Sequence, residues 1–141
     1  EYLAALGEHE GGAGTQRNKL EAAFVAIAKQ EDALTNRLLA NLRGRNGVRV
    51  IGATRNIGSN RVPTIAFKID GHHSGEFTKA MDEYGIAVRF GDFHTRRLVE
   101  ELGEDEDGGV IRVSMVHYNT LEQVDRFCAA MTAITGNGTA A

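Results

Sequence analysis

The sequence has a single cysteine, no long hydrophobic run and no cluster of basic residues, and each of these absences excludes a class of protein. One cysteine, Cys128, cannot form an internal disulfide, which agrees with a reducing compartment. No apolar run approaches the roughly 18 residues that a membrane span needs, and the N-terminus lacks the basic and apolar regions of a signal peptide. We therefore expect a cytoplasmic protein without a membrane partner.

The charged residues are nearly balanced, with 16 basic against 19 acidic residues and a formal net charge of -3. No tail or face collects enough lysine and arginine to bind a phosphate backbone, so nucleic acid is not an expected partner. A chain of 141 residues that is 42% hydrophobic and 25% charged has the size and composition of one globular domain. Because the first residue is Glu1 rather than methionine, we expect a trimmed or partial product.

The N-terminal residues predict a short helix, a connector and then one long helix. Glu1 to Leu6 has helical character, and the glycine-rich stretch from Gly7 to Gly14 predicts a flexible connector. We expect residues 1–14 to be a remnant of a preceding large domain with this connector. From Thr15 to about Gly44, hydrophobic residues recur at steps of three and four, as in an amphipathic helix. Such a helix is longer than one small domain can cover, so part of it is expected to pack on a neighbour.

The rest of the chain predicts strands and helices in mixed order. Hydrophobic and β-branched residues favour four strands, at Val48–Ile51, Thr64–Ile69, Ile86–Phe90 and Val110–Met115. Helices are expected from Ser74 to Gly85, over residues 95–102, and from Thr120 to Gly136. The predicted fold class is α+β, with a small, mostly antiparallel sheet of about four strands covered on one face by helices. This domain takes residues 15–135, and 136–141 are expected to be a disordered tail.

The predicted helix boundaries depend on particular capping residues. Ser74 is expected to be an N-cap, and Gly85 a left-handed residue just after the same helix. Thr120 and Gln123 have the spacing of a capping box. The pair His72 and His73 lies at a turn, where adjacent side chains point apart and no further ligand follows at metal-ligand spacing, so we expect turn or cap residues and no metal site.

Two segments resemble one enzyme family. Asp70 to His73 and then Tyr84 to Gly91 resemble the part of group II cysteine desulfurases that leads into the catalytic-cysteine loop. Gly109 to Thr120, with the Glu, Val and Asp that follow, is similar to the family signature Arg-Ile-Ser-Leu-x-x-Tyr-Asn-Thr-x-x-Glu-Val-Asp. With Gly47 to Val50, the similarity extends over nearly all of residues 15–135. The chain thus resembles the C-terminal small domain of a class V aminotransferase or cysteine desulfurase-like enzyme.

The resemblance implies a fold-type I pyridoxal-phosphate (PLP) enzyme that acts on an amino acid, usually as a homodimer. In that family the active site lies between a large cofactor domain and a small domain that closes over the substrate. The Schiff-base lysine and the acidic partner of the pyridine nitrogen belong to the large domain. The four lysines of this chain lie in no similar motif and are expected at the surface: Lys19, Lys29, Lys68 and Lys79. We therefore expect PLP on the large domain, no cofactor on this chain, and no activity of this chain alone.

The resemblance also assigns roles to two arginines. At the position of Arg112 the family binds the α-carboxylate of the substrate through a two-pronged guanidinium. At the position of Arg89 the family places an arginine that lines the way into the active site. The alternative for either residue is an ordinary strand arginine paired with a surface carboxylate.

His94 marks the sharpest departure from the family pattern. In the frame Val88 to His94, the histidine stands where a group II desulfurase has its persulfide-forming cysteine, and an imidazole cannot accept sulfane sulfur as a thiolate does. Cys128 falls on the buried stripe of the last helix and is expected in the core. The sequence therefore resembles a divergent branch that lacks the catalytic cysteine. His94 is a candidate catalytic proton carrier, with a solvent-facing loop histidine as the alternative.

Other interpretations of the sequence remain open. The reaction can be desulfuration, transamination, lyase or epimerase chemistry, because these differ by subtle placement of groups around one cofactor. A non-catalytic α+β binding or dimerisation module is the alternative from a different class, favoured by the absence of the family's lysine. The acidic run from Glu100 to Asp107 is expected to be a solvated loop without a binding role.

Overall fold

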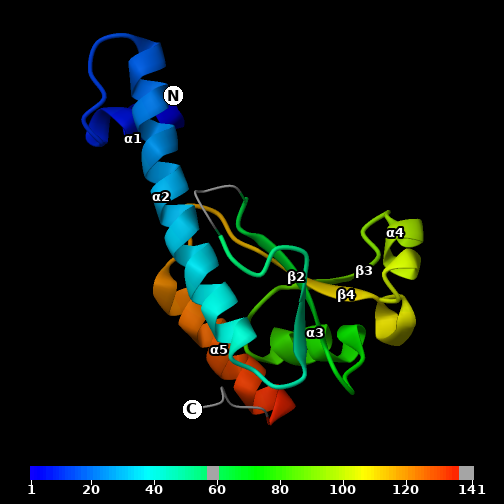
Figure 1. Cartoon of the computed structure of the whole chain (residues 1–141). Helices are drawn as coiled ribbons and strands as arrows, with labels where there is room; N and C mark the ends of the chain where they lie inside the picture. The colour runs from blue at the N-terminus through cyan, green and yellow to red at the C-terminus, as the bar shows by residue number, and fades with distance from the viewer. Residues whose placement is uncertain (57–60, 137–141) are drawn as a thin grey trace.

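The computed structural model describes residues 1–56 and 61–136, and these contain one four-stranded antiparallel sheet (Figure 1). Its strands are β1 (Val48–Ile51), β2 (Thr64–Ile69), β3 (Arg89–Gly91) and β4 (Val110–Ser114), in the order β1-β2-β4-β3. Every neighbouring pair is antiparallel, which confirms the predicted sheet.

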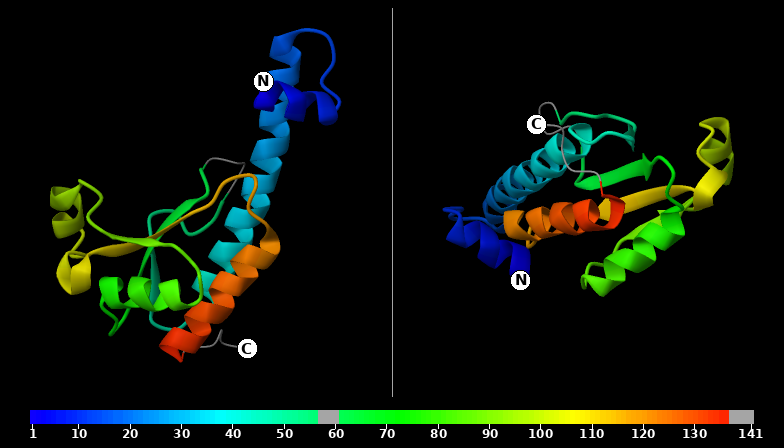
Figure 2. Two further views of the ribbon diagram at one scale, coloured as in Figure 1. Left: turned by 180° about the vertical axis from the view of Figure 1, so that it is seen from behind. Right: turned by 90° about the horizontal axis from the view of Figure 1, so that it is seen from below.

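Three helices cover one face of the sheet. They are α2 (Gln16–Arg43), α3 (Ser74–Glu83) and α5 (Leu121–Thr135), with α2 and α5 packed side by side (Figures 1 and 2). The short α4 (Arg96–Glu101) and a 3-10 turn, η1 (Glu106–Gly108), lie at the β3 end of the sheet, away from α2. The α+β class with helices on one face is therefore confirmed.

The core lies between this helical layer and the sheet. Along β2, Ile65, Phe67 and Ile69 are almost completely buried, because alternate residues of a strand point to the same face. The ring of Phe67 packs edge-on against the rings of Phe77 and Phe127, at centroid distances of 6.3 and 6.4 Å. Burying side chains of this size contributes about 2 to 3 kcal/mol each. One hydrophobic core therefore holds β2, α3 and α5 together.

The helix ends follow the predicted caps with one exception. Thr120 and Gln123 form the expected capping box, and Gly136 ends α5 in the left-handed conformation. At α3, however, the N-cap is His73, whose Nδ1 accepts a hydrogen bond from Gly75 N at 3.1 Å. Ser74 is instead fully buried and donates its hydroxyl to Gly109 O at 2.7 Å. The prediction was one residue off, because a buried acceptor competes for the serine hydroxyl.

The N-terminal segment differs from the expected connector. A helix, α1 (Tyr2–His9), continues past Leu6 and packs across the N-terminal part of α2 (Figure 1). Gly7 is buried in this contact, and a Cβ on it would lie 1.6 Å from Lys19 O, so only glycine allows the two helices to approach so closely. The prediction that the connector begins at Gly7 was therefore wrong.

The remaining boundaries shift by a few residues. Ile86 and Val88, expected in the third strand, pack against the core before the ladder begins at Arg89. The expected tail, 136–141, begins at the residue that caps α5, Gly136, and the rest of it, 137–141, lies outside the described part of the chain, as do residues 57–60 between β1 and β2. Within the described part, no helix is both long and apolar enough to cross a membrane.

Candidate functional site

The face of the sheet that the helices leave uncovered carries the candidate arginines. Arg112 of β4 pairs with Ala66 of β2 on one side and with Arg89 of β3 on the other. Residues that are directly opposite in a ladder point to the same face, so the two guanidinium groups share one face of the sheet. The fold thus brings together the two arginines that the sequence analysis singled out.

Arg112 is partly buried and has an unusual environment. Its Cζ atom lies 4.1 Å from the centroid of the Phe93 ring, within the range of a cation–π interaction. Its Nε is buried without a hydrogen-bond partner, and among the described residues no carboxylate forms an ion pair with its guanidinium. The alternative interpretation, a strand arginine paired with a surface carboxylate, is therefore wrong for Arg112. Within the described residues its guanidinium has no hydrogen-bond acceptor.

The loop that presents Phe93 is tightly turned. Phe93 and His94 both have left-handed backbone conformations, with φ values of 52° and 64°. The side chain of Asp92 accepts a hydrogen bond from His94 N at 3.0 Å, and its carbonyl accepts from Thr95 N at 2.9 Å and Thr95 Oγ1 at 2.6 Å. Left-handed non-glycine residues cost about 1 to 2 kcal/mol each, so these hydrogen bonds offset a real strain.

His94 and Arg89 are both exposed in this structure. Among the described residues, neither side chain makes a hydrogen bond or an ion pair, in contrast to the backbone of His94, which Asp92 holds. Arg89 lies on the same face as Arg112, and His94 follows Phe93 in the loop. Their positions allow the roles that the resemblance implies without testing them.

The acidic run is not a simple solvated loop. Glu104 is only 2% exposed, and its carboxylate accepts two hydrogen bonds from the Arg49 guanidinium, one of them from Nη2 to Oε2 at 2.7 Å. Lys68 is also buried, and its ammonium donates a hydrogen bond to the carbonyl of Glu106. The predictions of a solvated Glu104 and a surface Lys68 were therefore wrong. Together these two contacts fasten the segment before β4 to the uncovered face of the sheet.

Cys128 lies in the core, as predicted. It is 8% exposed, and burial raises the pKa of its thiol to about 11. A thiol that stays protonated at neutral pH and faces the core is a poor nucleophile. In this structure Cys128 is therefore a core residue with a protonated thiol.

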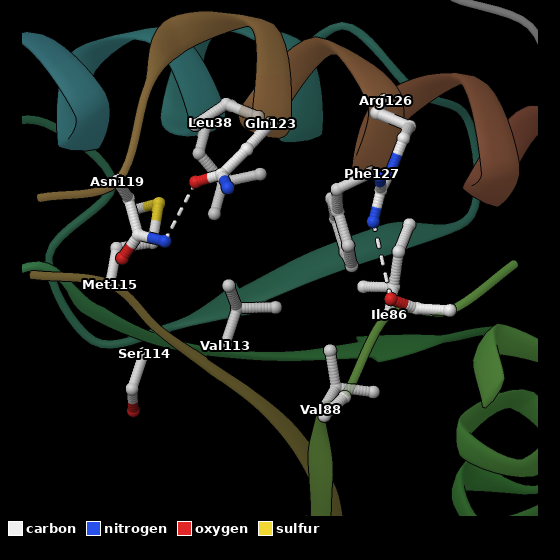
Figure 3. A pocket seen from close by; sticks show the side chains of 13 residues that line it. Leu38, Ile86, Val88, Val113, Ser114, Met115, Asn119, Gln123, Arg126 and Phe127 are labelled. Carbon is white, nitrogen blue, oxygen red and sulfur yellow. Dashed lines mark hydrogen bonds between the residues drawn. The ribbon is translucent and has the colours of Figure 1, made fainter.

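One hollow of the described structure lies away from these residues. Figure 3 shows this cavity of about 200 Å³ on the helical side of the sheet, between the start of α5 and residues 85–88. Its walls are mostly core side chains such as Leu38, Val113 and Phe127. At its edge, Arg126 Nη2 donates to Gly85 O at 3.2 Å. Neither Arg89 nor Arg112 lines it, so we treat it as a packing gap beside the unpaired segment 85–88.

The four lysines of this chain lie on three different elements. Lys68 points to the same sheet face as its ladder partner Arg49, but its buried ammonium is bound to Glu106 O. Lys19 and Lys29 lie on α2 and Lys79 lies on α3, on the helical side of the sheet. In the described residues no group of three or more His, Cys, Asp or Glu is arranged to hold a metal ion.

Phe93 is the site residue that the sequence analysis missed. Nothing in its local pattern distinguishes it from a core phenylalanine, because its contact with Arg112 joins two segments that are distant in sequence.

Comparisons with known proteins place the chain in a family. The family model Aminotransferase class-V matches residues 18–127. Over 110 residues, 77% of this chain and 27% of the relative, the sequence is 37% identical to an aminotransferase-like protein, FGM3, from Gibberella zeae. Over 131 residues, 93% of this chain and 26% of the relative, it is 34% identical to a probable cysteine desulfurase from Pseudomonas putida. The chain thus spans about a quarter of the length of these curated relatives.

Solved structures support the same assignment. A cysteine desulfurase from Thermococcus onnurineus NA1 matches with a TM-score of 0.71 and 25% identity, over 86% of this chain and 29% of that one. The cysteine desulfurase CsdA from Escherichia coli matches with a TM-score of 0.63 and 28% identity, over 86% of this chain and 31% of that one. On the family model and these similarities, the chain belongs to the class V aminotransferase family, on its cysteine desulfurase-like side.

Proposed function

We propose that this chain is the C-terminal small domain of a PLP-dependent enzyme that acts on an amino acid, and that Arg112 binds the α-carboxylate of the substrate. The family is PLP-dependent, and the similarity to desulfurases and aminotransferase-like proteins supports an amino-acid substrate. The reaction itself, whether desulfuration, transamination, lyase or epimerase chemistry, is left open by the proposal.

One observation carries the proposal: a partly buried guanidinium without a carboxylate partner. Ion pairs elsewhere join Arg37 to Asp125 and Arg49 to Glu104, whereas within the described residues Arg112 has the ring of Phe93 as its partner and no carboxylate. A partly buried cation without an anion is unfavourable, so the free edge of Arg112 is suited to an anionic ligand. A carboxylate matches the two parallel N–H donors of a guanidinium.

Arg89 and His94 complete the proposed site. Arg89, directly across the ladder from Arg112, adds positive charge that attracts the same carboxylate. His94 is exposed next to Phe93, and we propose its imidazole as the proton carrier of the site. The buried thiol of Cys128 does not take part.

We propose that the cofactor lies outside this chain. Lys68 is bound to Glu106 O and the other lysines lie on α2 and α3, which supports a cofactor site on a large domain of the same protein, where PLP would supply its electron-withdrawing chemistry. In this proposal the small domain orients the substrate and closes over it, and the isolated chain is inactive. A homodimer of the whole enzyme is part of the same proposal.

The test is the variant Arg112→Lys in the enzyme that carries this chain. Lysine keeps the charge but loses the two-pronged contact, so the KM for the amino acid should rise about 10- to 100-fold, the loss expected for a charge-assisted bidentate pair. The KM for the corresponding amine, which lacks the α-carboxylate, should not change. Arg43→Lys is the matched control, because Arg43 is an exposed arginine in the last turn of α2, far from the uncovered sheet face.

An equal KM for the amino acid in Arg112→Lys and Arg43→Lys would show that Arg112 does not bind the carboxylate. Activity of the isolated 141-residue chain with added PLP would contradict the assignment of the cofactor to another domain.

A further inference from the structure

We infer that Phe93 is a positioning residue that holds the Arg112 guanidinium ready for a carboxylate, and that it thereby sets the enzyme's preference for substrates with an α-carboxylate. The inference deepens the proposed function and rests on it. Its basis is the contact of the Phe93 ring with Arg112 Cζ, at 4.1 Å, combined with the left-handed turn that produces this contact.

The contact fixes an otherwise mobile side chain. Arginine has many rotamers, and within the described residues Arg112 has no hydrogen bond to select among them, since even its buried Nε is without a partner. The Phe93 ring, with Arg112 Cζ 4.1 Å from its centroid, is the contact that limits where the guanidinium can lie. Binding a ligand then costs less side-chain entropy, because the cation is already ordered.

The aromatic contact and a bound carboxylate use different parts of the guanidinium. A ring interacts with the face of the planar group, whereas a carboxylate approaches its edge, where the N–H bonds point. Phe93 therefore leaves the edge of Arg112 available. It also lowers the local polarity, which strengthens a charge-assisted hydrogen bond to a carboxylate.

The strain in the loop agrees with such a role. Phe93 and His94 adopt positive φ angles of 52° and 64°, although neither is glycine. The turn persists because Asp92 accepts hydrogen bonds from His94 N at 3.0 Å and from the Thr95 hydroxyl at 2.6 Å. Backbone strain of this kind is concentrated at sites where a side chain must be held in place. Here the side chain that the turn places is the ring on Arg112.

The first test uses NMR on the 141-residue chain itself. The Nε–Hε signal of Arg112, identified by its loss in Arg112→Lys, should be displaced upfield by the aromatic ring relative to the other arginines. The displacement should disappear in Phe93→Leu and persist in Phe93→Tyr. Phe24→Leu, which changes an exposed phenylalanine on α2, is the matched control and should leave the signal in place. Circular dichroism verifies that each variant is folded.

The second test uses the enzyme that carries this chain. Phe93→Leu should raise the KM for the amino acid about 5- to 30-fold, the range that follows from a desolvated cation–π contact, with kcat nearly unchanged. Phe93→Tyr should restore the KM, and the KM for the amine without a carboxylate should not respond to either variant. A purely structural role for Phe93 would change both substrates alike.

The two proposals fail in different ways. Absence of the upfield displacement, or an unchanged KM in Phe93→Leu while Arg112→Lys raises it, overturns the role of Phe93 and leaves the proposed function standing. An unchanged KM in Arg112→Lys overturns the proposed function, and the role of Phe93 in substrate preference falls with it, whatever the NMR signal shows.

Discussion

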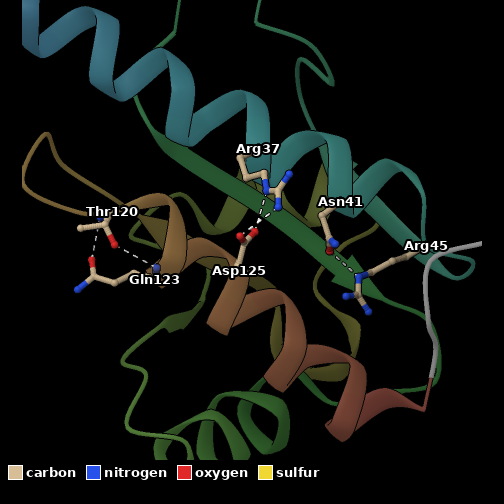
Figure 4. A network of polar contacts seen from close by, with 6 residues as sticks. All are labelled: Arg37, Asn41, Arg45, Thr120, Gln123 and Asp125. Atoms are coloured by element: carbon tan, nitrogen blue, oxygen red, sulfur yellow. Dashed lines mark hydrogen bonds and ion pairs between the residues drawn. The ribbon is translucent and has the colours of Figure 1, made fainter.

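Arg37 of α2 donates two parallel hydrogen bonds to Asp125 of α5, from Nε to Oδ1 at 2.7 Å and from Nη2 to Oδ2 at 3.0 Å (Figure 4). The bidentate pair joins the two helices that form most of the layer over the sheet. Asp125 also belongs to the segment that resembles the family signature, so this part of the signature has a structural role.

This pair predicts a pH-dependent contribution to stability. The hydrogen bond from Arg37 lowers the pKa of Asp125 below its usual range. A carboxyl group with a lowered pKa in the folded state stabilises the fold above its unfolded pKa, about 3.9, and this contribution is lost as the pH falls through the lowered value. Arg37→Gln should therefore lower the free energy of unfolding at pH 7, and the difference from wild type should shrink in acid.

Urea unfolding at several pH values measures this difference. Arg43→Gln, on the same helix and outside the pair, is the control and should show no such pH-dependent gap. If the difference in the free energy of unfolding between Arg37→Gln and wild type stayed constant down to acidic pH, the effect could not be assigned to the Asp125 carboxylate.

A second prediction concerns the buried carboxylate of Glu104. Replacing it in Glu104→Gln removes the charge that Arg49 binds, while the volume is kept. We expect a loss of about 1 to 2 kcal/mol in the free energy of unfolding, small for a buried carboxylate because the Arg49 side chain is 55% exposed and partly screened by water. Differential scanning calorimetry measures it. Glu101→Gln, an exposed neighbour in α4, should have almost no effect, and an equal loss in both variants would refute the special role of Glu104.

Most of the fold could be predicted because it depends on local patterns. The strands β1 and β2 were predicted to the residue, and the capping box of Thr120 and Gln123 is present as expected. The failures depend on contacts between distant segments. Gly7 lies in a glycine-rich stretch that is typical of a linker. In the structure, however, the close approach of α1 to α2 requires a glycine at this position. Glu104 belongs to an acidic run, but in the fold it is buried and hydrogen-bonded to Arg49, which is 55 residues away in sequence.

In the candidate site, too, the residues within a local motif could be predicted and the contact between distant segments could not. The signature around Arg112 and Arg89 pointed to both arginines, and the antiparallel register of β3 and β4 places them opposite each other. Phe93 could not be predicted, because a cation–π contact has no sequence spacing of its own and depends on a turn with two left-handed residues. Such a conformation is uncommon for phenylalanine and has no simple sequence signal.

A third prediction concerns the reactivity of Cys128. Burial raises the pKa of its thiol to about 11, so the folded chain should react very slowly with iodoacetamide at pH 8, and urea should make the reaction fast. Since the protonated thiol is favoured in the folded state, its contribution to stability is present below the unfolded pKa, about 8.5, and is lost as the pH rises toward 11. The stability difference between wild type and Cys128→Ala should therefore narrow over this range. Rapid alkylation of the folded chain would show that the thiol is accessible.

The last prediction separates the imidazole of His94 from its backbone. Asparagine tolerates a positive φ better than most residues, so His94→Asn should keep the turn, the hydrogen bond to Asp92 Oδ1 and the position of Phe93. In the whole enzyme, loss of a proton carrier should lower kcat about 100- to 10,000-fold and remove one limb of its pH profile, while the KM for the amino acid stays the same. Thr95→Ser, in the same loop, keeps the hydroxyl that bonds Asp92 O and is the matched control. An unchanged kcat and pH profile in His94→Asn would establish that His94 is a solvent-facing loop residue, because the variant removes only the imidazole.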